Sequence, residues 1–157
     1  MTRLYGRAAI GKRCLGRVPY GHWNTATFIA ALRHDRISAP FLIDGPMDGA
    51  MFLAYVERVL CLELRPNDLV ICDNLSCHKV RGVAEAIQAR GAQLHYLPAY
   101  SPDFDPIEMA FSKLKALLRK AAARDLANLI TAAACALDSF SASQCLNFFL
   151  HANYATN

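Results

Sequence analysis

The order of hydrophobic and polar residues predicts strands alternating with helices along most of the chain. Short apolar runs bounded by turn residues predict strands at residues 25–32, 39–43, 69–72 and 93–97. Apolar residues at helical spacing predict helices at residues 49–62, 80–90, 106–124, 126–140 and 143–154. The Gly- and Arg-rich stretch before residue 25 is only weakly periodic, and we expect it to be mostly loop.

The connections indicate how these elements assemble. The short turn His34-Asp35-Arg36 predicts that the first two strands are antiparallel. The later strands alternate with helices, which favours parallel pairing and helices on the faces of the sheet. The apolar run 69–72 is typical of a strand buried on both faces. The sequence therefore predicts an α/β fold with a mixed sheet.

Polar residues at the predicted helix ends support these bounds. Asp48 is suited to cap the helix at 49–62, and Ser141 or Ser143 is suited to cap the last helix. Gly91 is suited to close the helix at 80–90. With 157 residues, the chain is long enough for one domain with a real core.

Composition excludes several classes of protein. A hydrophobic fraction of 54% excludes a disordered tail. We find neither an apolar run of bilayer length nor a signal-peptide pattern, so we expect a cytoplasmic protein without a membrane partner. The six cysteines lack paired C-x-x-C spacing and should stay reduced. Buried thiols explain them better than a metal site made of Cys72, Cys77 and His78.

Charge is unevenly distributed, although the net charge is only +4. Residues 1–36 hold seven basic residues and one acidic residue, residues 38–78 hold two and six, and residues 79–124 hold eight and four. Basic flanks around an acidic centre suit a phosphate-rich partner and a metal site. Ordinary solvated charges explain the same pattern equally well.

Two acids occupy positions suited to chemistry. Asp73, followed by Asn74, comes directly after the predicted strand 69–72, and ligands bind at this edge of open α/β sheets. Its carboxylate is a suitable ligand for Mg²⁺ or Mn²⁺, although an Asp-Asn pair also forms turns. Glu108 falls on the first turn of the predicted helix that Asp105 caps and Pro106 opens. There it can serve a metal, or it can be half of a capping box without chemistry.

The residues around these acids form two long motifs. Asp73-Asn74-Leu75-Ser76-Cys77-His78 is followed by Leu97-Pro98-Ala99-Tyr100-Ser101-Pro102 and then by Pro106-Ile107-Glu108, with 34 residues between the two acids. Together the motifs resemble the second and third acidic motifs of mariner-superfamily DDE transposases, most closely those of the bacterial insertion-sequence branch. The resemblance covers nearly all of the chain.

The resemblance implies a ribonuclease H-like catalytic domain that cuts and joins DNA with divalent metal. By matching position, Asp73 would be the second catalytic acid and Glu108 the third, and both would bind metal. Two Mg²⁺ or Mn²⁺ ions about 3.5–4 Å apart would be expected in a complete site. The implied partners are transposon ends and target DNA, bound by a homodimer at the nucleoid.

The chain departs from the family pattern at the first catalytic Asp. In the family this Asp lies on a central strand upstream of the segment that here begins at Arg3. We therefore expect the whole chain, residues 1–157, to be a partial catalytic domain that lacks this strand and the upstream helix-turn-helix region. Asp44 matches a turn at the end of another strand and is a poor substitute, and Asp35 fits a hairpin residue.

Other residues have expected supporting roles. His78 matches a family histidine that either approaches the scissile phosphate or braces the loop, and Asn74 is a further supporting candidate. Asp105 stands where the family has Asn, and it can cap the helix, raise the pKa of Glu108 or bind metal. Tyr100 either stacks on a base or packs under its loop. Exposed basic residues are expected to contact DNA phosphates: Lys79, Lys113, Lys115, Arg119 and Lys120.

The expected function is that of part of an insertion-sequence transposase. The missing acid would come from an upstream-frame product or from a full-length transposase. The alternatives are an inactive remnant and a non-catalytic DNA-binding or regulatory module. We expect no DNA cleavage by this chain alone, and we expect low solubility or a rearranged sheet because the neighbours of the missing strand would be unpaired.

Overall fold

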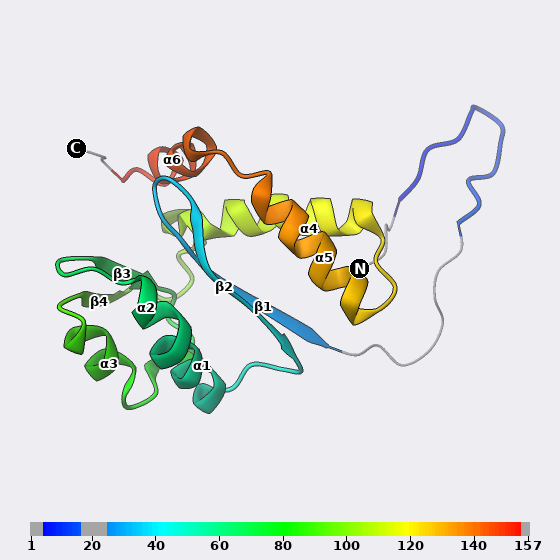
Figure 1. Cartoon of the computed structure of the whole chain (residues 1–157). Helices are drawn as coiled ribbons and strands as arrows, with labels where there is room; N and C mark the ends of the chain where they lie inside the picture. The colour runs from blue at the N-terminus through cyan, green and yellow to red at the C-terminus, as the bar shows by residue number, and fades with distance from the viewer. Residues whose placement is uncertain (1–4, 17–24, 155–157) are drawn as a thin grey trace.

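The computed structural model describes residues 5–16 and 25–154 (Figure 1). The strands are β1 (Ala26–Leu32), β2 (Ile37–Asp44), β3 (Leu69–Cys72) and β4 (Gln93–Tyr96). The longer helices are α1 (Gly49–Tyr55), α3 (Val83–Ala89), α4 (Pro106–Ala121), α5 (Leu126–Asp138) and α6 (Ala142–His151). A π-helical turn (Val56–Leu60) continues α1 into the short α2 (Cys61–Glu63), and short 3₁₀ turns cover Ser76–Lys79 and Pro102–Phe104.

The strands form two separate pairs within the described residues. β1 and β2 are antiparallel, and the turn between them is closed by the amide of Arg33, which donates to the carbonyl of Arg36 at 2.8 Å. β3 and β4 are parallel and in register from the Leu69–Gln93 pair to the Cys72–Tyr96 pair. The predicted strands and their directions are thus confirmed, but no hydrogen-bonded ladder joins the two pairs in this part of the chain.

The prediction that strand 69–72 is buried on both faces is wrong. Leu69 is 57% exposed, and the other residues of β3 are half-buried. β3 has one partner strand among the described elements, β4, and its residues Leu69, Val70 and Ile71 line an open pocket of about 450 Å³ instead of packing in the core. The end of β1 lines the same cavity, through Ala31 and Leu32. The unpaired edges of two strands therefore meet at one space in the fold.

An ion pair connects the two strand pairs. The Arg33 guanidinium, at the end of β1, donates to both carboxylate oxygens of Asp68 and to the carbonyl of Glu63. The Asp68 carboxylate also accepts from the amide of Arg65 at 2.8 Å. Charge-assisted hydrogen bonds of this kind are stronger than neutral ones, so they fix the β1–β2 turn against the start of β3.

Helices lie on either side of the β1–β2 hairpin (Figure 1), and a hydrophobic cluster is found on each side. The first joins the α1–α2 helix to α3, and its fully buried residues include Val56, Val83 and Ile87. The second lies between α4 and α5 and is built on Leu114 and Leu118, with Phe28 of β1 packed against it. A helix thus packs on each side of the hairpin, as an α/β fold requires.

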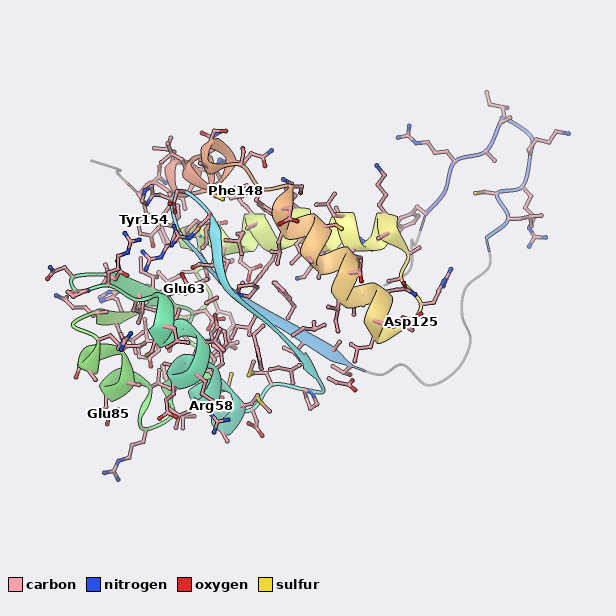
Figure 2. The ribbon with its side chains drawn as sticks, viewed as in Figure 1. Arg58, Glu63, Glu85, Asp125, Phe148 and Tyr154 are labelled. Atoms are coloured by element: carbon pink, nitrogen blue, oxygen red, sulfur yellow. The ribbon has the colours of Figure 1, made fainter. Side chains whose placement is uncertain are left out.

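Most of the predicted helix bounds are confirmed to within a few residues. Asp48 caps α1, Ser141 caps α6, and Gly91 closes α3 with a φ of +73°. Asp125 caps α5 (Figure 2), where its carboxylate accepts from the amide of Asn128 at 2.8 Å.

The helix predicted at 80–90 begins at Val83 instead of Val80. Val80 is extended, and Gly82 adopts a φ of +101°, which places the helix start directly after it. The Glu85 side chain (Figure 2) then accepts from the amide of Gly82 at 2.9 Å. The sequence periodicity alone cannot detect this turn.

No single helix in the described residues is both long and apolar enough to cross a membrane. Only α5 and α6 taken together reach the required length and composition, and the chain bends by 81° between them.

Candidate catalytic site

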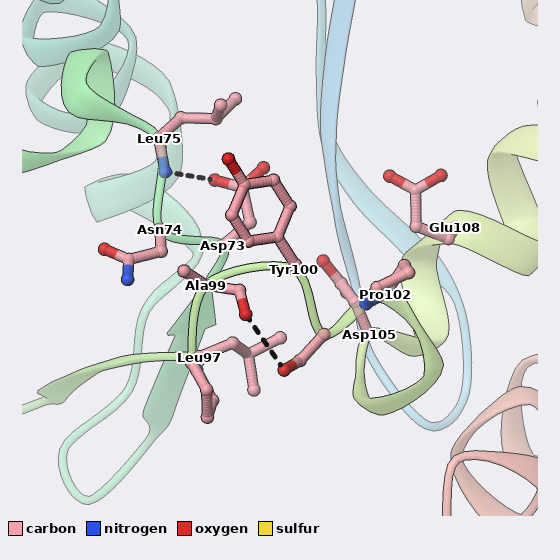
Figure 3. A pocket seen from close by; sticks show the side chains of 11 residues that line it. Asp73, Asn74, Leu75, Leu97, Ala99, Tyr100, Pro102, Asp105 and Glu108 are labelled. Atoms are coloured by element: carbon pink, nitrogen blue, oxygen red, sulfur yellow. Dashed lines mark hydrogen bonds between the residues drawn. The ribbon is translucent and has the colours of Figure 1, made fainter.

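Asp73 lies directly after β3, at the carboxyl end of that strand. One carboxylate oxygen, Oδ1, accepts from the amide of Leu75 at 3.2 Å (Figure 3) and lies 2.6 Å from Nδ1 of His78. Among hydrogen bonds within the described residues, none uses the other oxygen, Oδ2. The loop therefore fixes the carboxylate by one oxygen and leaves the second available to a ligand.

His78 is held from two sides. Its ring stacks on Phe52 of α1, with centroids 4.1 Å apart and an angle of 33° between the planes. Its carbonyl accepts from the hydroxyl of Tyr96 at 2.8 Å. With a side chain only 17% exposed, His78 is well placed to brace the Asp73 loop, which is one of its two expected roles.

Glu108 lies on the first turn of α4. Asp105 caps this helix, with Oδ1 accepting from the amide of Ile107 at 3.3 Å, and Pro106 takes the first helical position. The described helix start contains no reciprocal hydrogen bond from Glu108 back to Asp105, so the capping-box alternative is not formed. The Glu108 side chain is exposed and free to meet a ligand.

The acids converge on one open pocket of about 330 Å³. Asp73, Asp105 and Glu108 line it from β3 and from the start of α4, and the loop from Leu97 to Pro102 forms its wall (Figure 3). Burial, and after it the charges of Glu108 and Asp73, raise the pKa of Asp105. Asp105 is therefore close enough to both other carboxyl groups to interact with them electrostatically, although 34 residues separate Asp73 from Glu108.

The donor set suits a hard divalent cation, because carboxylate oxygens are the ligands that Mg²⁺ and Mn²⁺ prefer. Asn74 adds an amide on the pocket wall, and its buried Oδ1 has no hydrogen-bond partner in the described structure. Within the part of the chain described, however, no three His, Cys, Asp or Glu side chains are arranged to hold an ion. The residues that line the pocket thus suit a divalent cation chemically, but the described residues do not form a complete ligand set for it.

The cysteines take no part in this site. All six are free thiols, and burial raises the pKa of Cys72 to about 12. Neither Cys72 nor Cys77 lines the acidic pocket, and the described residues contain no group of three side chains that includes Cys72, Cys77 and His78 and could hold an ion. Asp44, at the end of β2, does not line the pocket, and Asp35 lies in the β1–β2 turn paired with Arg36 at 3.0 Å.

The basic residues expected to contact DNA differ in their surroundings. Lys115, Arg119 and Lys120 of α4 are exposed, and so is Lys79, which lies 5.6 Å from the centroid of the Tyr96 ring. Lys113 is engaged within the fold. Its Nζ donates to the carbonyl of Ser139 at 2.9 Å and to Gln144 at 2.7 Å, and it lies 4.0 Å from the centroid of the Phe140 ring.

Comparison with solved structures shows the fold. The crystal structure of the Mos1 strand transfer complex contains a chain that is 13% identical, with a TM-score of 0.74 over 95% of this chain. The Mos1 transposase paired-end complex with the left transposon end gives 12% identity and a TM-score of 0.71 over 94% of this chain. Each match covers 46% of the Mos1 chain, so the chain spans less than half the length of these relatives.

The fold is thus ribonuclease H-like, with one acid directly after β3 and another on the first turn of α4, as expected from the sequence. The family model described as DDE superfamily endonuclease matches residues 1–130, and the chain belongs to this family. Members of the superfamily generally use divalent metal ions. No protein with a curated description matches the sequence.

Proposed function

We propose that this chain supplies two acids, Asp73 and Glu108, to the catalytic centre of an insertion-sequence transposase that cuts and joins DNA with Mg²⁺ or Mn²⁺. The observation that carries the proposal is the single open pocket that both side chains line. The family match and the Mos1 fold support the same reaction class.

The residues of the pocket have separate roles in this proposal. Asp73 would present Oδ2 to a cation while His78 and Leu75 hold Oδ1. Glu108 would reach the cation from the rigid first turn of α4. The bound ions would supply charge neutralisation at the entering and leaving oxygens of a phosphodiester. Asp105 would cap α4 and add negative charge beside Glu108.

A third carboxylate would complete the ligand set. The cavity of about 450 Å³ between the free edges of β1 and β3 supports a further strand at that place, because both edges offer unpaired backbone groups. A strand there would end beside Asp73 and carry an acid into the pocket. An upstream-frame product or a full-length transposase would supply it, and a homodimer would bind paired DNA ends at the nucleoid.

The DNA surface would lie beside the pocket. Lys79 follows the Asp73 loop, and Lys115, Arg119 and Lys120 are exposed along the helix that begins at Glu108's turn. Such cations bind phosphates without regard to sequence and make affinity fall with salt. Lys113 would contribute to the fold instead, because its ammonium group is already engaged.

Metal-dependent DNA binding tests the proposal. Fluorescence anisotropy of a labelled duplex with Mg²⁺ and with a chelator should show tighter binding with Mg²⁺. Asp73→Asn and Glu108→Gln should each abolish the difference, whereas Asp103→Asn, which removes an exposed charge outside the pocket, should preserve it. Equal binding with and without metal would contradict the catalytic proposal and favour a DNA-binding module.

Cleavage provides the second readout. This chain alone should not nick DNA, because its described residues hold an incomplete ligand set. Nicking with Mn²⁺ that Asp73→Ala abolishes would show that the chain carries a complete site, contrary to the proposed need for a further strand.

A further inference from the structure

Tyr100 adopts a backbone conformation that is unfavourable for its side chain. Its φ is +59°, in the left-handed region that large residues rarely occupy outside glycine-like turns. Such conformations persist where surrounding structure imposes them, and they are concentrated at ligand-binding and active sites. The loop thus holds the Tyr100 side chain in a direction that the backbone alone would not favour.

The Tyr100 ring has no packing role in the structure. The residue is 102% exposed, and no hydrogen bond to its hydroxyl is formed among the described residues. By contrast, the hydroxyl groups of Tyr96 and Tyr154 each donate to a backbone carbonyl, at 2.8 Å in both cases. Packing under the loop, one of the two roles considered from the sequence, is therefore excluded for Tyr100.

The ring stands on the rim of the acidic pocket. Tyr100 lines the same pocket as Asp73 and Glu108 (Figure 3). Leu75, which is 55% exposed, also lines this pocket. The carboxylates suit a metal ion, and a bound metal ion would attract the charged phosphate of a nucleotide. The exposed aromatic ring and the exposed leucine beside them would suit its flat, apolar base.

We propose that Tyr100 stacks on the base next to the phosphate bound at the acidic pocket. The proposal rests on the proposed function, since it assigns a second contact to the same DNA strand. Stacking on an aromatic ring is available to every base, so the contact would position the strand without selecting a sequence. The fixed backbone of the loop would keep the ring in place before DNA arrives.

Three substitutions separate stacking from a structural role. Tyr100→Gly removes the ring and accepts the positive φ, so its Tm should equal or exceed that of the unchanged protein. Tyr100→Phe keeps the ring. Tyr5→Ala removes another exposed tyrosine, which is 90% exposed and does not line the pocket. Circular dichroism melts of each variant test whether the fold is preserved.

The binding probe is a short single-stranded DNA carrying a fluorescent adenine analogue whose emission falls when its base stacks. Measured with Mg²⁺, Tyr100→Gly should weaken binding by about 5- to 150-fold, the range expected for the loss of one base–aromatic stack. It should also remove the fall in emission, whereas Tyr100→Phe and Tyr5→Ala should retain both signals.

The outcomes distinguish the two proposals. If the unchanged protein shows Mg²⁺-dependent binding and Tyr100→Gly binds and quenches equally well, the stacking proposal is overturned and the proposed function stands. If the unchanged protein neither binds nor quenches, both are overturned. A lowered Tm in Tyr100→Gly, with binding unchanged, would assign the ring a structural role instead.

Discussion

The Nδ1 atom of His78 lies 2.6 Å from the Oδ1 atom of Asp73, and the two residues belong to one loop between β3 and α3. Because the His78 ring stacks on Phe52 of α1, that helix helps to position the Asp73 carboxylate in the pocket. The orientation of Asp73 thus depends on packing as well as on its own loop.

Removing the His78 hydrogen bond should weaken metal binding. His78→Phe keeps the stack on Phe52 and loses Nδ1, so Mn²⁺ affinity should fall by about 10- to 100-fold while the Tm stays nearly constant. His78→Asn can restore an N–H donor toward Asp73 and should recover part of the affinity. Calorimetric titration with Mn²⁺ measures both, and equal affinities for the Phe variant and the unchanged protein would contradict a positioning role.

The Arg33–Asp68 ion pair should make stability depend on pH. The Arg33 guanidinium lowers the pKa of Asp68 below its usual value, so the folded state binds fewer protons on this group than the unfolded state does. The contribution of the ion pair to the free energy of unfolding is therefore present above the pKa of about 3.9 that Asp68 has in the unfolded state. It is lost as the pH falls through the pKa that Asp68 has in the folded state. Asp68→Asn should lower stability by about 1 kcal/mol at neutral pH, since the pair is partly exposed.

Thermal melts across the acid range test this prediction. The Tm difference between Asp68→Asn and the unchanged protein should shrink as the pH falls below 3.9 or so. Asp35→Asn serves as the control, because the Asp35–Arg36 pair is more exposed and should matter less. A Tm difference that is constant with pH would show that the Asp68 charge contributes nothing.

Substitutions of two lysines on α4 should affect different properties, protein stability for Lys113 and DNA binding for Lys115. Lys113→Met keeps the aliphatic part of the side chain but loses both hydrogen bonds and the cation–π contact with Phe140, so stability should fall by about 1–2 kcal/mol. Lys115→Met should leave stability unchanged, weaken DNA binding and reduce the salt dependence of the affinity by about one phosphate contact. Denaturant melts and anisotropy at several salt concentrations measure the two effects. A reduced salt dependence of DNA binding in Lys113→Met would show that Lys113 contacts DNA and would contradict its assignment to the fold.

The positions of the two acids could be predicted from local sequence. An apolar run ending in Asp73 indicates a strand end, and Asp105-Pro106 indicates a helix start that presents Glu108 on its first turn. These rules depend on neighbouring residues only, and the structure confirms the strand and the helix start. Their meeting in one pocket followed from resemblance to a family, and the pocket geometry agrees with it.

Contacts between distant residues could not be predicted in the same way. The partners of Lys113 are 26 and 31 positions away, and no local pattern indicates that its ammonium group is engaged. The Arg33–Asp68 ion pair joins residues that are 35 positions apart, so no local pattern indicates it either. The exposure of Leu69 depends on which strand occupies the neighbouring edge, a property of the assembled sheet rather than of the apolar run.

The central claim is that Asp73 and Glu108 bind the same cation. A double-mutant cycle with Asp73→Asn and Glu108→Gln, followed by calorimetric titration with Mn²⁺, tests it most directly. If the claim holds, each single substitution removes most of the affinity and the double variant is little worse than either one. Independent, additive losses, or titration curves that neither substitution changes, would contradict the claim.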